Sequence, residues 1–451
     1  MKKNSILCTL MCLVSLGSLA SCGPKTSEST DTSKPDPTSK PDPTPKPDPT
    51  PAKKEILVLS GAEDQRTFVM GKANEYLRAQ KLDSKYELTY TAHGEDKIDS
   101  EVADWTAETA PDIYSFSCDK STPLAAAGAL ATVPDEYAEQ MKKTLSETAY
   151  ASATFNGDLV GYAYTASNGY FTYYDSSLPG IDAIVHDNKA GSIVDNIEDW
   201  LKYCEDHGKT FAYNLKEAFY TVGALTTFGA SWKVEYNRDG SVKKITSDFA
   251  SDKGLKAAKM ILKIMSSDAV VYTQDAPGVN NVAFCVNGAW ALSNDSQGNK
   301  SAYTDAKVKT TTLPNATVGT EKKHIRSFAG TKLYGVNPFK SNGKAERLNT
   351  LHGIANYLTS DDVQSARFDD SQQAPSSKAV SAMDKVKSNA ALSALANQSA
   401  DAMAQANLPG NIWTAPATFA TWAFDNAKSE VSDDVIMTQL QQLDAAVQAS
   451  K

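Results

Sequence analysis

Residues 55–80 read EILVLSGAEDQRTFVMGKANEYLRAQ, and this stretch decides the fold. It opens with the apolar run Ile56-Leu57-Val58-Leu59, which is typical of a buried strand. From Glu63 to Gln80 it continues with the spacing of an amphipathic helix. The pattern recurs downstream as a predicted strand, helix and strand over residues 86–91, 96–106 and 111–116. Strands that alternate with helices predict a parallel sheet with right-handed crossovers, and therefore an α/β lobe.

Further elements are predicted along the rest of the chain. A hairpin turn is expected at Asp239-Gly240, because this pair supplies the positive φ angles of a tight turn. A strand is expected over residues 284–290, and helices over 122–128, 252–265, 354–368 and 435–447. The last third is therefore helix-rich, and its helices are expected to brace the lobes.

Composition limits the classes of protein to consider. The 451 residues exceed the length of one typical domain, so two lobes are expected. Hydrophobic residues make up 41% and charged residues 22% of the chain, which excludes a wholly disordered or polytopic membrane protein. The balance of 45 basic and 54 acidic residues contains no basic block, so no nucleic-acid partner is predicted.

The N-terminus predicts export. Lys2 and Lys3 precede an apolar run that ends in Leu19-Ala20-Ser21-Cys22, which is typical of a secretory signal over residues 1–21. The final tetrapeptide resembles the bacterial lipobox, whose cleavage leaves the cysteine as a lipidated N-terminus. We therefore expect Cys22 to anchor the chain to the cell membrane. An ordinary cleavage site beside an incidental cysteine is the alternative.

A proline-rich segment follows the predicted anchor. Residues 22–54 carry Lys-Pro-Asp-Pro-Thr three times, at 34–38, 40–44 and 46–50. Proline at this density favours polyproline II, so the segment could hold the folded body up to ~100 Å from the membrane. A spacer explains the composition, and a proline-rich ligand for another domain is the alternative.

Motifs of metal and nucleotide chemistry are missing from the sequence. No P-loop, His-Glu-x-x-His or Gly-x-Ser-x-Gly motif is present, and the five histidines are isolated, so neither a metal nor a cofactor is predicted. The scattered Cys118, Cys204 and Cys285 indicate neither a zinc site nor a disulfide framework. Paired carboxylates remain open as a catalytic alternative, with Glu63, Asp64, Asp119 and Glu217 as the candidates.

Several segments of the body contain sequence motifs in a fixed order. The stretch from Pro111 through Phe116, Asp119 and Lys120 to Leu130 is similar to the "GPDI…aHDR…sGLL" pattern of bacterial maltose-binding proteins. Further matches, to "yNGkLiayP", "lIYNkdLLP", "fNLqEPYFTW", "iNGPWAWSN" and "pFvG…nYLl", lie at residues 155–162, 173–179, 213–221, 286–294 and 327–359. The matches cover almost all of residues 55–451 and resemble a lipid-anchored solute-binding protein of a carbohydrate ABC importer.

This resemblance implies a fold, a ligand and partners. The implied fold is the type II periplasmic-binding-protein fold, in which two α/β lobes, each a sheet flanked by helices, are joined by hinge strands. The implied bounds are 55–165 with 311–370 for the N-terminal lobe and 166–310 with 371–451 for the C-terminal lobe. The implied ligand is an oligosaccharide of the maltose or maltodextrin kind, delivered to a permease by a monomeric protein that is not an enzyme.

The resemblance also implies the ligand-binding residues. Sugar sites stack aromatic rings on the apolar faces of pyranoses and use polar groups to hold the hydroxyls. The positions carried over from the motifs, with one aromatic chosen for its large face, are Asp64, Phe116, Asp119, Lys120, Asn168, Glu217, Phe219, Trp290 and Trp422.

Some positions depart from the family pattern. Lys120 replaces a bidentate arginine with a point charge, and Asn168 offers an amide where a carboxylate is expected. Glu63 competes with Asp64, and the late stacking aromatic is Trp413, Phe419 or Trp422. These changes question maltose as the ligand more than sugar binding itself. A surface glycoside hydrolase and a binding protein for a non-sugar ligand are the competing functions.

Overall fold

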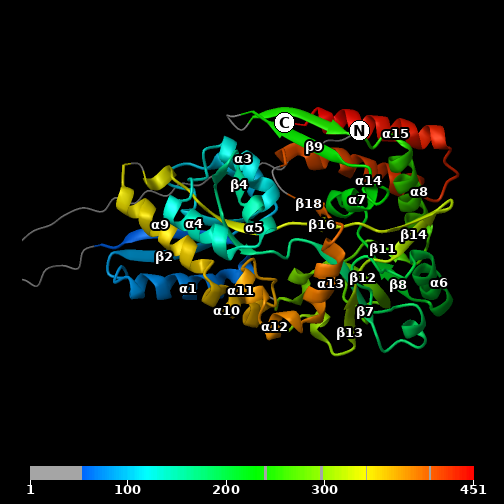
Figure 1. Cartoon of the computed structure of the whole chain (residues 1–451), viewed down its shortest axis with the longest axis horizontal. Helices are drawn as coiled ribbons and strands as arrows, with labels where there is room; N and C mark the ends of the chain where they lie inside the picture. The colour runs from blue at the N-terminus through cyan, green and yellow to red at the C-terminus, as the bar shows by residue number, and fades with distance from the viewer. Residues whose placement is uncertain (1–52, 238–240, 295–297, 342, 406–407, 451) are drawn as a thin grey trace, which may run out of the picture. The chain divides into compact units, whose positions relative to one another are not determined.

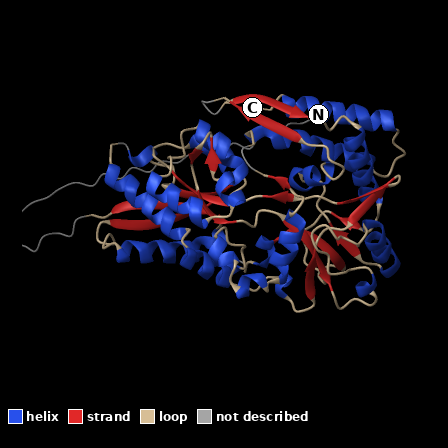
Figure 2. Cartoon of the chain, viewed as in Figure 1, coloured by secondary structure: helices blue, strands red, loops and turns tan. Residues whose placement is uncertain are grey.

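A computed structural model describes residues 53–237, 241–294, 298–341, 343–405 and 408–450 (Figure 1). The expected signal segment, Cys22 and almost all of the expected tether lie outside the described residues. The body is built on two five-stranded sheets with helices packed around them (Figure 2). The α/β class and the two-sheet organisation expected from the sequence are therefore confirmed.

The first sheet contains the strand predicted at residues 56–59. Its strands lie in the order β2 (Tyr86–Ala92), β1 (Glu55–Gly61), β3 (Ile113–Ser117), β17 (Lys332–Val336) and β6 (Tyr162–Thr165). Strand β1 pairs in parallel with β2 and with β3, as predicted. Strand β17 runs antiparallel between β3 and β6, so the sheet is mixed rather than purely parallel.

The second sheet repeats this arrangement. Its strands lie in the order β11 (Val270–Val271), β8 (Thr210–Ala212), β12 (Val282–Gly288), β7 (Tyr170–Asp175) and β13 (Val308–Thr311). Strand β8 pairs in parallel with β11 and β12, and β7 runs antiparallel between β12 and β13. In both sheets the fourth strand is therefore the antiparallel one.

The two antiparallel strands connect the sheets. Strand β7 enters the second sheet directly after β6 leaves the first, through residues 166–169 only. Strand β17 returns to the first sheet after β13 has completed the second. The chain crosses again after α10 (Asp361–Ser371), because α13 (Ala390–Ser399) packs on β7 and β13. These crossings are the hinge strands and segments expected of a two-lobed fold.

Helices of the first half cover the first sheet. Helix α1 packs on β2, and α9 packs on β17 and β6. The helices of this half are α1 (Arg66–Ala79), α2 (Ile98–Glu101), α3 (Ser121–Ala126), α4 (Asp135–Thr144), α5 (Glu147–Ser152), α9 (Ala345–Leu358) and α10, with 3-10 turns η1 (Glu63–Gln65), η2 (Val102–Asp104), η3 (Cys118–Lys120) and η7 (Phe339–Ser341).

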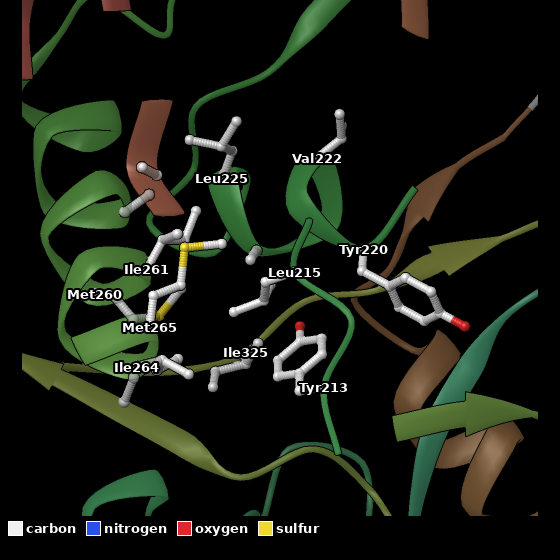
Figure 3. Close-up of a cluster of buried hydrophobic side chains, with 14 of the residues drawn as sticks. Tyr213, Leu215, Tyr220, Val222, Leu225, Met260, Ile261, Ile264, Met265 and Ile325 are labelled. Atoms are coloured by element: carbon white, nitrogen blue, oxygen red, sulfur yellow. The ribbon is translucent and has the colours of Figure 1, made fainter. Parts of the chain in front are cut away.

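Helices of the second half pack around the second sheet and on each other. Helix α7 packs on α8, and Figure 3 shows Leu215, which precedes α7, beside Ile261 and Met265 of α8. The helices are α6 (Ile197–His207), α7 (Ala218–Leu225), α8 (Asp252–Ser266), α13, α14 (Thr414–Asn426) and α15 (Asp433–Gln448), with the short α11 (Lys378–Ser381) and α12 (Asp384–Lys387) and turns η4 (Ile181–Ala183), η5 (Ala289–Leu292), η6 (Ala302–Thr304) and η8 (Gly410–Trp413).

Within the described ranges, four two-stranded sheets accompany the two large ones. The predicted hairpin is confirmed in its strands, because β9 (Trp232–Tyr236) and β10 (Val242–Ser247) pair antiparallel, while turn residues 238–240 lie outside the described residues. The other pairs are β4 (Thr154–Phe155) with β5 (Asp158–Leu159), β14 (Asn315–Val318) with β15 (Glu321–His324), and β16 (Phe328–Ala329) with β18 (Met403–Ala404).

The helix predicted over residues 354–368 is wrong as a single element. Helix α9 ends at Leu358, and α10 begins at Asp361. The reason is local capping: the Ser360 side chain accepts a hydrogen bond from the Val363 backbone N–H and so starts a new helix. Apolar spacing continues across the break and hides it in the sequence.

Two large cores correspond to the two sheets. One contains Leu59 and Ile354, and the other contains Trp200 and Phe284, whose rings stack at 4.6 Å. Ala316 packs in the second core, although the sequence analysis assigned residues 311–370 to the first lobe. The lobe boundaries drawn from the sequence stay a prediction.

A buried ion pair joins the first strand to helix α9. Arg347 is 4% exposed, and its Nη2 lies 2.8 Å from Oδ1 of Asp112, which is fully buried. Arg347 also lies 2.6 Å from Glu55 and donates to the Ile56 carbonyl at 3.0 Å. The second Asp112 oxygen accepts from the Val58 N–H at 2.7 Å. The carboxylate therefore depends on one cation and one strand amide.

We predict that Arg347→Met destabilises the body by about 3–5 kcal/mol, because it leaves the Asp112 carboxylate buried and without its cation. Urea unfolding followed by circular dichroism measures the change. The matched control is Lys344→Met, which removes an exposed partner of the same Glu55 and should leave the midpoint nearly unchanged. Equal midpoints for both variants would show that the buried pair contributes nothing specific.

Candidate functional site

A cavity of about 660 Å³ is lined by residues from both halves of the body. Its first-half walls come from turns that follow β1, β2 and β3, and its second-half walls come from segments that follow β8 and β12. The lining residues are Ala62, Asp64, Gly94, Glu95, Asp96, Ser117, Asp119, Lys120, Asn168, Glu217, Ala218, Phe219, Tyr220, Gln274, Trp290, Lys332, Gln405 and Trp413. Ligands of open α/β sheets bind outside the carboxyl ends of the strands, and this cavity occupies that position in both halves.

Asp119 is a buried acid of the cavity wall with several polar partners. It lies in η3 directly after β3 and is 3% exposed. Its Oδ1 accepts from Gln405 Nε2 at 2.9 Å, and its Oδ2 accepts from Trp413 Nε1 at 3.1 Å. Burial raises the pKa of Asp119, although the nearby Lys120 ammonium opposes the rise. The carboxylate thus fixes the orientation of an indole ring that lines the cavity.

The same network includes the crossing segment between the sheets. Asn168 lies in residues 166–169, and its Nδ2 donates to Gln405 Oε1 at 2.7 Å. Gln405 follows β18 and therefore contacts Asn168 and Asp119 together. Amide and carboxylate groups from three distant parts of the chain are held in one hydrogen-bonded row. Such a row can exchange its internal bonds for bonds to hydroxyl groups of a ligand.

A buried ion pair forms another part of the wall. Lys332 Nζ lies 2.5 Å from Glu95 Oε2, and the Tyr164 hydroxyl donates to the other Glu95 oxygen. Burial by itself would raise the pKa of Glu95, but Lys332 and these hydrogen bonds lower it to about 2. Glu95 is therefore an anion at neutral pH. Its charge is already compensated within the protein.

The second half contributes an acid and aromatic rings at the start of α7. Glu217 is the residue before this helix, and its Oε1 accepts from Asn214 Nδ2 at 2.7 Å. Burial raises the pKa of Glu217, and repulsion from Asp96 raises it further. The Phe219 ring lies 6.3 Å from Trp290 and 6.4 Å from Trp413. Carboxylates and aromatic faces are thus placed side by side.

Trp290 depends on a glycine for its place. It lies in η5, directly after β12 ends at Gly288. A Cβ at Gly288 would meet the Trp290 ring at 2.0 Å, so only glycine lets the indole fold over the end of its own strand. Gly288 at the end of β12 is therefore required for the position of the Trp290 ring.

Seven of the residues chosen from the sequence lie on this cavity. They are Asp64, Asp119, Lys120, Asn168, Glu217, Phe219 and Trp290. The rival Glu63 pairs with Arg66 at 2.7 Å instead, and it does not line the cavity. The role of these seven residues in ligand binding stays a prediction.

Two chosen residues do not line this cavity. Phe116 is fully buried in β3, in the core of the first sheet, where its ring lies 5.7 Å from Tyr114. Trp422 lies on α14 and packs against Phe419 at 5.6 Å. The aromatic that lines the cavity in this part of the chain is Trp413, which the sequence analysis had left as an alternative.

Other lining residues were not chosen from the sequence. Glu95 and Asp96 follow β2 as Asp64 follows β1, so the rule of the strand ends could have found them. Gln274 follows β11 in the same way, and Gln405 follows the short strand β18, whereas Lys332 is the first residue of β17.

Some absences are also informative within the described ranges. No group of three or more histidine, cysteine, aspartate or glutamate side chains there is placed to hold a metal ion. No helix in the same ranges has the length and apolar character needed to cross a membrane. Cys118, Cys204 and Cys285 are free and buried, and burial raises the pKa of each thiol to about 12.

Comparisons with known proteins find the same fold at low sequence identity. No protein-family model and no curated protein sequence matches the chain. A solved protein with acarbose superposes with a TM-score of 0.71 at 22% identity, over 88% of this chain and 99% of the other. The maltodextrin-binding protein of L. casei BL23, solved without ligand, gives 0.69 at 16% identity, over 88% and 100%.

A third solved structure extends the comparison. The maltotriose-binding protein of Thermus thermophilus, bound with maltotriose, gives a TM-score of 0.63 at 18% identity, over 87% of this chain and 100% of the other. The architecture is thus that of a two-lobed solute-binding protein. More narrowly, the chain has the fold of the maltose-binding-protein type, as the resemblance in sequence implied.

We predict that Glu217→Gln becomes more stable relative to the wild type as the pH rises from about 4 to about 7. The raised pKa means that the native state keeps a proton that the unfolded chain has already lost. The stability contributed by this group is therefore present at low pH and is lost as the pH rises through its native pKa. Urea unfolding across this range measures the difference.

Glu63→Gln provides a control of opposite sign. The Arg66 hydrogen bond lowers the pKa of Glu63, so its contribution is present above the ordinary pKa and is lost as the pH falls. Relative to the wild type, this variant should lose stability as the pH rises. If the stability of both variants relative to the wild type changed with pH in the same direction, the assigned environment of Glu217 would be contradicted.

Proposed function

We propose that the protein is an extracytoplasmic solute-binding protein that captures an oligosaccharide in this cavity and delivers it to a membrane permease of the ABC type. The observation that carries the proposal is the pairing of aromatic faces with hydrogen-bonding groups from both halves of the body. Trp290, Phe219 and Trp413 supply the faces, and Asp119 and Asn168 supply polar groups. The neighbours solved with maltotriose and with acarbose support a carbohydrate.

Capture follows from the two chemical characters of a sugar. The C–H faces of a pyranose bury well against an indole or phenyl ring, while each hydroxyl must regain the hydrogen bonds that it loses from water. Trp290 and Trp413 take the first task, and Asp119, Asn168 and Gln405 take the second. A ligand that touches both halves favours the conformation in which the halves are close together. The segments between the sheets act as the hinge.

We propose a receptor rather than a hydrolase. A general acid must be within reach of the glycosidic oxygen, with a proton to donate. Both carboxylate oxygens of Asp119 already accept hydrogen bonds from Gln405 and Trp413, which favours a fixed acceptor over an acid in turnover. Incubation of maltodextrins with the protein should return intact sugar, and released products would remove the receptor proposal.

The location and partners belong to the same proposal. The signal segment, Cys22 and the proline-rich tether support export and lipid anchoring at the cell surface. The long tether suits a protein that binds its ligand away from the membrane and returns to a permease. We take the working form to be a monomer that needs no cofactor.

We predict that maltodextrins raise the melting temperature of residues 53–451 in a saturable manner and that Trp290→Ala weakens their binding by at least about tenfold. The loss follows from the removal of the ring that faces the pyranose. Isothermal titration calorimetry gives the dissociation constants. The matched control is Trp422→Ala, which removes an indole that lies outside the cavity.

The outcomes separate the assignment of the residue from that of the function. Equal losses for Trp290→Ala and Trp422→Ala would mean that general destabilisation causes the effect. Unchanged affinity in a folded Trp290→Ala variant would remove this ring from the site. A thermal shift with peptides but with no sugar would overturn the carbohydrate proposal while leaving the fold intact.

We predict that Cys22→Ser releases the protein from the cell membrane, because the thiol that carries the lipid is lost. Detergent partitioning and metabolic labelling with a fatty acid measure the anchor in the expressing cell. The control is Cys118→Ser, which should keep the label. Fatty-acid label on the Cys22→Ser protein would show that the anchor lies elsewhere or that another cysteine is modified.

A further inference from the structure

The charges on the cavity wall do not balance. The cavity is lined by more carboxylates than ammonium groups. The carboxylates are Asp64, Glu95, Asp96, Asp119 and Glu217, and the ammonium groups are Lys120 and Lys332. Both lysines are already paired. Lys332 lies 2.5 Å from Glu95, and Lys120 is shared between Asp99 at 3.2 Å and Asp119 at 3.6 Å. Among the other three carboxylates, burial raises the pKa of Asp64 and the Lys332 charge opposes this rise, while no cation on the described wall pairs with Asp96 or Glu217.

These three carboxylates, Asp64, Asp96 and Glu217, form no ion pair with any described residue. They come from both halves: Asp64 and Asp96 follow β1 and β2, and Glu217 precedes α7. Asp96 and Glu217 are near enough for their charges to repel. The three are not simply helix caps, because neither η1 nor α7 has a side-chain cap hydrogen bond at its start.

A ligand that fills the cavity changes the energy of these charges. It displaces water that now screens Asp64, Asp96 and Glu217, so their mutual repulsion grows in the lower dielectric. Neutral hydroxyls donate hydrogen bonds to carboxylates but leave the net charge in place. An ammonium group on the ligand donates hydrogen bonds and also cancels a charge, which gives electrostatic complementarity.

The rest of the wall still fits a polyhydroxylated body. Ser117 is 5% exposed, lines the cavity, and its hydroxyl has no hydrogen-bond partner among the described residues, so it is available to a ligand group. Trp290 and Trp413 offer π faces that accept both C–H surfaces and cations. The wall thus combines sugar-binding surfaces with an uncompensated negative region around Asp96 and Glu217.

We propose that the cavity selects an oligosaccharide that carries a protonated amino group, held near Asp96 and Glu217, over the neutral oligosaccharide of the same size and linkage. The inference rests on the proposed function and specifies the ligand class for the same cavity. It assigns Asp96 and Glu217 as specificity-determining residues.

Matched pairs of ligands test it by calorimetry at about pH 6, where glucosamine-type amines are protonated. One pair is maltotriose and its derivatives with an amine at C6 of either terminal ring. The other is the β-linked glucosamine trimer and its fully N-acetylated form. We expect the cationic member of at least one pair to bind about tenfold tighter than its neutral partner, and added salt to narrow the difference.

Variants locate the preference. Asp96→Asn and Glu217→Gln should each reduce the ratio of neutral to cationic dissociation constants by about threefold, because each removes one of the two charges near the amine. Glu63→Gln is the matched control, since Glu63 lies next to Asp64 in sequence but pairs with Arg66 outside the cavity. It should leave this ratio at the wild-type value.

The results distinguish this inference from the proposed function. Neutral members that bind as tightly as their cationic partners in both pairs would overturn the selectivity while leaving oligosaccharide capture in place. A ratio unchanged by Asp96→Asn and by Glu217→Gln would overturn the assignment of these residues. Failure of every saccharide to bind would overturn the proposed function and this inference together.

Discussion

The exchange of strands between the two sheets is the constraint on which the rest of the structure depends. Each sheet obtains its antiparallel strand from a chain segment that comes from the other sheet: β7 directly follows β6, and β17 follows β13 after the short strands β14, β15 and β16. Neither sheet can form all of its inter-strand hydrogen bonds unless its antiparallel strand arrives from the other half of the chain. The two halves are therefore joined through strand-to-strand connections of fixed length, and the turns at the strand ends of both halves meet on one cavity.

A buried carboxylate organises that cavity. Asp119 cannot stay buried without partners, because an unpaired charge in the interior is costly. It finds them in Gln405 and Trp413, which arrive from the last part of the chain, and Gln405 in turn binds Asn168 of the first crossing. Satisfying one acid therefore positions an indole ring and an amide as well. The aromatic and the polar parts of the cavity wall are therefore held in place by the same hydrogen-bond network around Asp119.

The sequence predicts the parts of the site that follow a local rule. Asp64, Asp119 and Trp290 come directly after strands, so pattern and resemblance both reach them. Phe116 comes from the resemblance alone, but β3 is buried on both faces, and its ring packs in the core of the first sheet rather than on the cavity. Lys332 and Gln405 were not predicted from the sequence, because their positions on the cavity depend on contacts with residues that are more than two hundred positions away. The break at Ser360 was hidden for the converse reason, since a capping bond overrode a continuous apolar spacing.

The three sheltered cysteines have a practical consequence for work with the body of this protein. Cys118, Cys204 and Cys285 are buried, and their thiols remain protonated at neutral pH, so alkylating reagents meet little thiolate. A single cysteine introduced on the surface near the hinge would therefore be the preferred target of a maleimide dye in residues 53–451. The fold thus offers a scaffold for a fluorescent reporter of ligand capture without prior removal of its native thiols.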